Sequence, residues 1–128
     1  MDFVGPSDLE WLAQHGVPFA ADAVAAHLGC PQRRPDLCVT SVEVAASPQT
    51  YVHAGVPPAY FAYGAYDLVV PVASQGLSIE RPWAAERDGN GVEFEVARAG
   101  HNLDMSNFDD RTMERWLDRL LAGDFAPG

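Results

Sequence analysis

The sequence has few basic residues and no long hydrophobic run. Its 128 residues include only 8 Lys or Arg against 18 Asp or Glu, so the formal net charge is −10. Such a balance argues against nucleic acid or an anionic membrane as a partner, because either would need a basic patch. No apolar stretch approaches the roughly 20 residues of a membrane-spanning helix. Residues 1–3 lack the basic region of a signal peptide, so a cytoplasmic location is the default expectation.

Cysteine is also scarce. Only Cys30 and Cys38 are present, and two cysteines alone do not make a zinc site. Their spacing allows a disulfide that would close the loop between them and stabilise the fold by about 2–4 kcal/mol. Because the sequence does not fix the redox compartment, the bonded and the free states both stay open.

The composition is that of one folded domain. Hydrophobic residues make up 48% of the chain, and 128 residues are enough to enclose one core. There is no internal repeat and no low-complexity tract. The acids are scattered along the chain, so the negative charge mainly indicates solubility. We therefore expect a single domain over residues 1–128.

Three segments are predicted to be strands. Residues 59–63 form an unbroken apolar run rich in aromatics, which is typical of a strand buried on both faces of a parallel sheet. Residues 92–97 alternate with period two, which indicates a strand at a sheet edge. Residues 2–4 form a very short extended piece. Because helical segments separate these strands, we predict an α/β fold of about three parallel strands with flanking helices.

Two helices are predicted before the first long strand. Ser7 and Glu10 form a capping box, which predicts a helix that begins at Ser7 and stops at Gly16. A second helix fits residues 19–28, where apolar residues recur with helical spacing. The pattern of residues 39–46 is too weak to choose between a strand and a helix.

Two further helices are predicted in the second half. One begins near Val72, and Pro82 is expected to interrupt or end it, because proline clashes with the preceding turn. The last helix follows Asp109 and Asp110, which suit its amino end, and it stops at Gly123. Its apolar stripe predicts a buried face made of Met113, Trp116, Leu117, Leu120 and Leu121.

A candidate acid and a candidate base follow the two long strands. Asp67 comes three residues after Gly64, and His101 comes directly after Gly100. In open α/β sheets, ligands and catalytic side chains collect at the carboxyl ends of the strands. An acid and a histidine there suggest the orienting carboxylate and the general base of a hydrolase. The plainer interpretations are a turn acid that caps the next helix and a surface histidine.

The other candidates are weaker. Three histidines fit helix ends or loops better than ligand positions, namely His15, His27 and His53. Ser7 and Ser47 are better explained as a helix cap and a turn residue than as nucleophiles. Asp104 is only weak evidence for a cation site. No cofactor and no metal ion is expected.

Four short motifs together resemble the carboxyl-terminal half of an α/β-hydrolase. The similar group is the esterase, lipase and prolyl-oligopeptidase-like branch. The resemblance implies that Asp67 is the catalytic acid and His101 the catalytic base. It also implies that Gly64 and Gly100 are the small residues that let the backbone turn beside them. The motifs are residues 5–9, 47–52, 57–71 and 99–101.

The sequence departs from this family where the nucleophile should be. The family carries its serine on a Gly-x-Ser-x-Gly elbow upstream of these motifs, and no such pattern occurs here. The oxyanion-hole loop, which lies earlier still, is also missing. We therefore expect a fragment, a truncated gene product or one piece of a split enzyme.

Such a chain would be inactive alone and would act on a small acyl or ester substrate once a serine-bearing second chain completes it. The first alternative is a non-catalytic binding or assembly domain that keeps the hydrolase fold. The second is an independent small fold that resembles the family by chance. An uncovered sheet edge at residues 2–4 further predicts a homodimer or a complex with a separate amino-terminal half.

Overall fold

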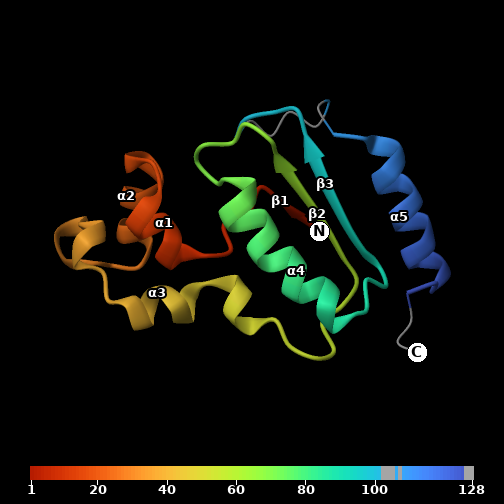
Figure 1. Ribbon diagram of the computed structural model, residues 1–128, viewed down its shortest axis with the longest axis horizontal. Helices are drawn as coiled ribbons and strands as arrows, with labels where there is room; N and C mark the ends of the chain where they lie inside the picture. Colours follow the sequence, from red (N-terminus) through yellow and green to blue (C-terminus); the bar gives the residue numbers. More distant parts are fainter. Residues whose placement is uncertain (102–105, 107, 126–128) are drawn as a thin grey trace.

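A computed structural model describes residues 1–101, 106 and 108–125. The strands and helices, in chain order, are β1 (Asp2–Phe3), α1 (Leu9–His15), α2 (Pro18–His27), α3 (Thr40–Ala46), β2 (Ala59–Gly64), α4 (Leu77–Glu86), β3 (Val92–Ala97) and α5 (Asp110–Ala122). Short 3₁₀ turns lie at Pro31–Arg33, Pro35–Leu37 and Pro48–Tyr51, and a π-helical turn, η4 (Val72–Gly76), leads into α4. Figure 1 shows α4 in front of the sheet, α5 beside it and α1–α3 on the opposite side of the molecule.

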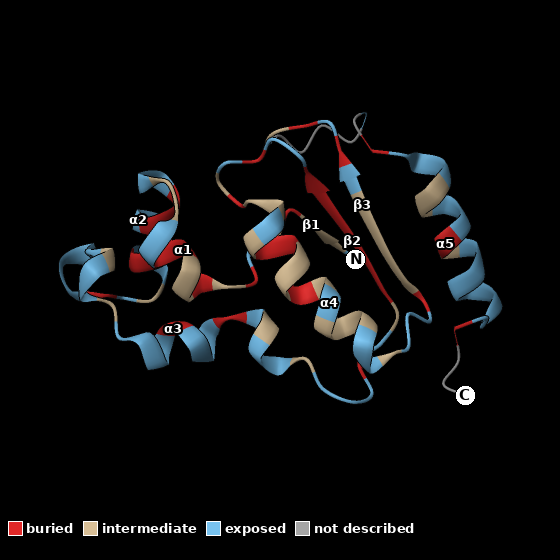
Figure 2. Ribbon diagram, in the orientation of Figure 1, coloured by how far each residue is buried: buried red, intermediate tan, exposed pale blue. Residues whose placement is uncertain are grey.

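The strands form one parallel sheet in the order β1-β2-β3. β1 pairs only with Phe61 and Ala62, whereas β3 pairs with all six residues of β2. Every residue of β2 is buried, as Figure 2 shows, while β3 has one exposed and several half-buried residues. The predicted three-stranded parallel α/β arrangement is therefore confirmed, with 59–63 at the centre and 92–97 at an edge.

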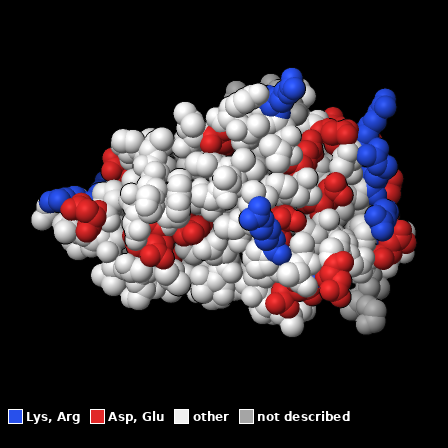
Figure 3. Space-filling model, in the orientation of Figure 1, with Lys and Arg blue, Asp and Glu red and all other residues white. Residues whose placement is uncertain are grey.

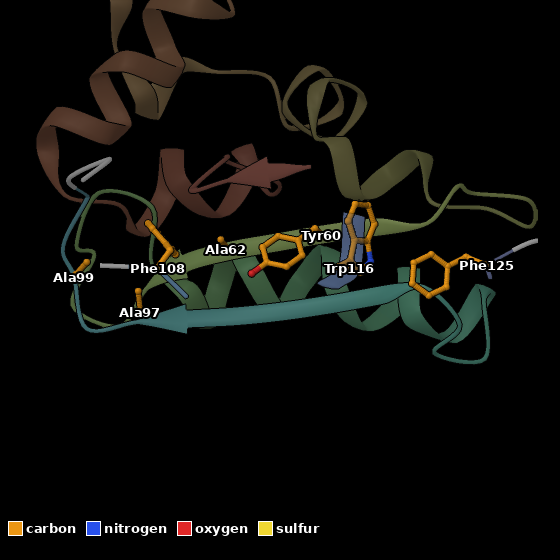
Figure 4. Packing of buried hydrophobic residues seen from close by; sticks show 7 residues of the cluster. All are labelled: Tyr60, Ala62, Ala97, Ala99, Phe108, Trp116 and Phe125. Carbon is orange, nitrogen blue, oxygen red and sulfur yellow. The ribbon is translucent and has the colours of Figure 1, made fainter. Parts of the chain in front are cut away.

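Successive residues of β2 face opposite sides of the sheet, as the strand pleat requires. Tyr60 and Ala62 pack in the cluster that includes Trp116 of α5, which Figure 4 shows from close by. Phe61 and Tyr63 pack in the cluster that includes Ile79 of α4. Two helices thus cover the two faces of one strand, and this explains why its sequence does not alternate.

Edge-on aromatic contacts fix both helices on the sheet. The ring of Trp116 lies 5.7 Å from that of Tyr60, and the ring of Trp83 lies 5.6 Å from that of Phe61. Both indole N–H groups donate to backbone carbonyls, at Gly91 and Pro57. Each such aromatic pair contributes about 0.5–1.5 kcal/mol beyond the apolar area it buries.

The segment α1–α3 has a core of its own beside the sheet. Its buried residues are Leu9, Leu12, Ala13, Ala20 and Val24. Residues 40–46 form a helix, whereas their sequence did not distinguish a helix from a strand. A disulfide joins Cys30 and Cys38 and so ties the end of α2 to the start of α3.

A buried glutamine attaches α1 to the rest of the molecule. The side-chain oxygen of Gln75 accepts from the backbone N–H groups of Ser7 and Asp8, at 3.0 and 2.8 Å. The Ser7 hydroxyl donates to the backbone carbonyl of Gln75. Each of these bonds spans at least 67 residues of sequence, so they define how α1 sits on η4.

The predicted helix start at Ser7 is wrong by one residue. Asp8 is the N-cap, and its Oδ1 accepts from Trp11 N at 2.9 Å. Ser7 cannot cap the helix because its hydroxyl, fully buried, is occupied by Gln75 and Ser78. Ser47 is not simply a turn residue either, because its buried hydroxyl accepts from Leu9 N at 2.8 Å.

The prediction that Pro82 interrupts or ends its helix is wrong, since Pro82 lies inside α4, which continues to Glu86. Proline removes one intrahelical hydrogen bond and crowds the preceding turn. Here residues on both sides of Pro82 are fixed to the sheet: Ile79 is buried, and Trp83 packs on Phe61. This tertiary packing outweighs the local cost.

The last helix runs from Asp110 to Ala122, as predicted, with Gly123 in the left-handed conformation after it. Its predicted buried face is only partly correct. Trp116 is buried and Met113 and Leu117 pack against the core, whereas Leu121 is 84% exposed. Leu120 is also exposed.

Charged side chains are spread over the surface. Figure 3 shows a column of basic groups over α5 and separate basic groups elsewhere, with acids scattered across this face. Within the described residues, each helix is too short or too polar to cross a membrane.

Candidate active site

The buried carboxylate of Asp67 is held by the turn that follows β2. Its Oδ1 accepts from Val69 N and from Val70 N, both at 2.8 Å, and the Asp67 side chain is 0% exposed. The backbone N–H of Asp67 donates to Gly64 O at 3.2 Å and closes the turn. The carboxylate therefore has one fixed orientation, with Oδ2 directed away from this turn.

The imidazole of His101 meets that second oxygen. His101 Nδ1 lies 2.8 Å from Asp67 Oδ2, and the His101 side chain is 43% exposed. Because an ionised carboxylate can only accept hydrogen bonds, Nδ1 carries the hydrogen. In the neutral ring, the other nitrogen, Nε2, is then the acceptor. The pair presents a basic nitrogen on an exposed ring that a buried acid orients.

Backbone contacts bring the two residues together. The N–H of Tyr66 donates to Ala99 O at 3.0 Å, and the N–H of Ala65 donates to Ala97 O at 2.8 Å. The segment that carries His101 therefore continues along the turn that carries Asp67, beyond the end of the regular sheet.

Glycine at position 64 permits this close approach. A Cβ on Gly64 would lie 2.5 Å from Ala99 O and also too close to Gly100 O. A Cβ on Gly100 would have its nearest neighbour, Tyr66 O, at 4.0 Å. Of Gly64 and Gly100, only Gly64 is required by the space around it.

A cavity of about 640 Å³ lies beside His101. It is bounded by α1 and α2, by the start of the chain, and by the turn after Asp67. The lining residues are Phe3, Val4, Gly5, Pro6, Leu9, Leu12, Phe19, Ala20, Ala23, Val24, His27, Ala46, Pro48, Val69, Val70 and His101. Its size is in the range of small-molecule sites, about 300–1,000 Å³.

The other predicted candidates lie elsewhere. His15 stacks on Trp11 at 5.4 Å, and His53 is an exposed loop residue, whereas His27 lines the cavity. Asp104 lies outside the described residues. Among the residues that the structure describes, no group of three or more His, Cys, Asp or Glu side chains could hold a metal ion.

Tyr63 is structural rather than catalytic. Its hydroxyl lies 2.8 Å from both Asp2 Oδ2 and Gly5 O, and its single hydrogen is shared between these two acceptors. Burial, together with the charge of Asp2, raises the pKa of Tyr63 far above its usual value, so the hydroxyl stays protonated.

Three features of the site have no signal in the sequence. The donors at Val69 and Val70 are backbone groups, and Gln75 acts through a contact between distant segments. The apolar cavity depends on how α1 and α2 pack beside the sheet.

The chain matches no known family model and no curated protein sequence. The site must therefore be interpreted from its own geometry.

Proposed function

We propose that Asp67 and His101 are the acid and the base of a serine hydrolase that acts on carboxylic esters, and that a second polypeptide supplies the serine. The observation that carries this proposal is the 2.8 Å contact between a buried carboxylate and an exposed imidazole. Both residues follow neighbouring parallel strands, where catalytic groups of α/β sheets collect. The motifs that resemble an esterase half support the same interpretation.

The chemistry follows from the orientation of the ring. Asp67 would hold His101 in the tautomer with hydrogen on Nδ1 and would stabilise the imidazolium that forms. Nε2 would take the proton from a serine hydroxyl as its oxygen attacks the ester carbonyl carbon. The same proton would then pass to the leaving alcohol oxygen.

The nucleophile is assigned to another chain because the sequence contains no Gly-x-Ser-x-Gly elbow. The hydroxyls of Ser7 and Ser47 are buried and occupied by backbone groups. Next to Asp67, Leu68 is 72% exposed and Tyr66 is also exposed. Large apolar side chains in contact with solvent beside the pair suit a surface that a partner covers.

The test is to co-express this chain with a Gly-x-Ser-x-Gly protein encoded beside it and to assay the purified complex with p-nitrophenyl butyrate. We expect turnover by the complex, and a fall of about 10⁴-fold in kcat for His101→Ala or Asp67→Asn. His53→Ala is the matched control, because that exposed histidine lies in a loop far along the chain from the pair. An active complex that His101→Ala leaves unchanged would refute the proposal.

The second candidate is a non-catalytic binding or assembly domain. The missing serine elbow and the exposed Leu68 favour it equally well. A stable complex with the neighbouring protein that hydrolyses no ester, yet dissociates on Leu68→Asp, would select this function instead.

A further inference from the structure

The cavity beside His101 has an unusually uniform lining for so acidic a protein. None of the described residues around it is Asp, Glu, Lys or Arg, although the chain has 18 acids. Its polar side chains are the two histidines, His27 and His101. A concave apolar surface with few polar groups is the usual form of a small-molecule site.

The exposed aromatic side chain of Phe19 marks this cavity further. Phe19 is 73% exposed, on the first turn of α2, and lines the cavity. A phenyl ring left in water forgoes the favourable free energy that its burial would yield. A ligand with an apolar body would recover part of this free energy by covering the ring.

The tautomer of His101 determines which kind of polar group a ligand needs. Because Asp67 accepts from Nδ1, the neutral ring offers Nε2 as a hydrogen-bond acceptor. The ligand must therefore present a donor to it. A hydroxyl satisfies this need, whereas an ester or ketone oxygen, which can only accept, does not.

The charge of the protein favours a ligand whose head group is neutral. A carboxylate or phosphate head would find no Lys or Arg among the described lining residues and would approach a protein of net charge −10. It would also come near the buried carboxylate of Asp67. A primary hydroxyl brings the donor without the charge.

We propose that this cavity binds a linear aliphatic alcohol, with the chain along α1 and α2 and the hydroxyl donating to His101 Nε2. The site rests on the same Asp67–His101 pair as the proposed hydrolase, and would take the alcohol part of its ester. Binding needs neither the serine nor the second chain, so the purified protein is sufficient for the test.

The experiment titrates ¹⁵N-labelled protein with 1-butanol, 1-hexanol and 1-octanol and follows amide shifts by NMR. Each added methylene buries apolar area worth about 0.8 kcal/mol, so Kd should fall about fourfold per carbon until the cavity is full. The shifts should map to α1, α2 and the turn after Asp67. Butanoate, hexanoate and octanoate, which match the alcohols in length, should bind more weakly.

A pair of variants on one helix separates the cavity from general effects. Ala23 and Ala26 are both exposed on α2, but only Ala23 lines the cavity. Ala23→Phe fills the site and should raise Kd for 1-octanol at least tenfold, while Ala26→Phe should leave it unchanged. His101→Ala should raise Kd about fivefold, the range of one neutral hydrogen bond.

Three outcomes would overturn the inference: no dependence of Kd on chain length, equal effects of the two phenylalanine variants, or tighter binding of the alkanoates. The last would identify an anion site. Alcohol binding with an inert serine complex would leave this inference standing and reject the hydrolase. An active complex without alcohol binding would reject this inference and leave the proposed hydrolase standing.

Discussion

Gly64 and Ala99 lie in direct backbone contact, so that a Cβ on Gly64 would come within 2.5 Å of the Ala99 carbonyl oxygen. Thirty-five residues of sequence separate them, and the contact closes the gap between the ends of β2 and β3. Asp67 follows one of these residues and His101 the other. The distance between Asp67 and His101 therefore depends on having glycine, which has no Cβ, at position 64.

The first prediction is that Gly64→Ala separates the pair. The new Cβ must push the Ala99 segment away, and such overpacking costs about 1–3 kcal/mol in the free energy of unfolding. Urea denaturation measures this loss. Gly100→Ala is the control, because the nearest heavy atom there is 4.0 Å away, and it should cost clearly less. Equal losses would contradict the contact.

The second prediction concerns the tautomer of His101. Asp67→Asn keeps an oxygen for Val69 N and Val70 N but places a donor against Nδ1. The ring must then carry its hydrogen on Nε2. Imidazole ¹⁵N shifts should therefore exchange between the two nitrogens, and identical shifts in both proteins would show that Asp67 does not orient the ring. Asp22→Asn, at an exposed site on α2, should change nothing.

The third prediction is that the backbone donors need the carboxylate. Asp67→Ala leaves the N–H groups of Val69 and Val70 without their acceptor, and Val70 is buried. An unsatisfied buried donor costs about 1–3 kcal/mol. Asp67→Ala should thus destabilise the protein by about 2–4 kcal/mol and by more than Asp67→Asn does, as urea midpoints can show.

The fourth prediction concerns the disulfide. Cys30 and Cys38 are eight residues apart, and opening so short a loop costs about 2–3 kcal/mol in the chain-entropy account. Dithiothreitol should lower the urea midpoint of the wild type. It should have no effect on the Cys30→Ala/Cys38→Ala double variant, and an equal shift in both proteins would reject the bond.

The fifth prediction is a pH effect at Glu43. Burial and, secondly, the charge of Glu10 raise the pKa of this carboxyl above its usual 4.5. The folded state therefore binds the proton more tightly than the unfolded state, and Glu43 lowers stability as the pH rises from about 4.5 through its folded pKa. Glu43→Gln should stabilise the protein at pH 7 and lose this advantage below pH 4. A constant difference between the two proteins across this range would contradict the shift.

The parts of the fold set by local pattern were predictable from the sequence. The aromatic run of β2, the alternation of β3 and the caps of α5 each have a cause within a few residues. The closeness of Asp67 and His101 also follows a simple rule, because neighbouring parallel strands end at the same edge of a sheet. Their catalytic roles remain a proposal.

The parts that depend on distant contacts were not predictable. The local sequence predicts that Ser7 caps the helix, but its hydroxyl donates instead to the backbone carbonyl of Gln75, 68 residues away. The local sequence predicts that Pro82 interrupts the helix, but the residues on both sides of it pack on the sheet and keep the helix continuous. The cavity exists only because α1 and α2 pack beside the turn after β2, and no periodicity encodes that arrangement.

The segment α1–α3 begins and ends at the same place in the molecule. Gln49 N donates to Ser7 O at 3.2 Å, and Leu9 N donates to the Ser47 hydroxyl, so the two ends meet. Because the two ends meet, a change in the length of residues 9–46 leaves the order and direction of the strands unaltered. Selection could thus redesign the cavity wall while the acid and the base stay where they are.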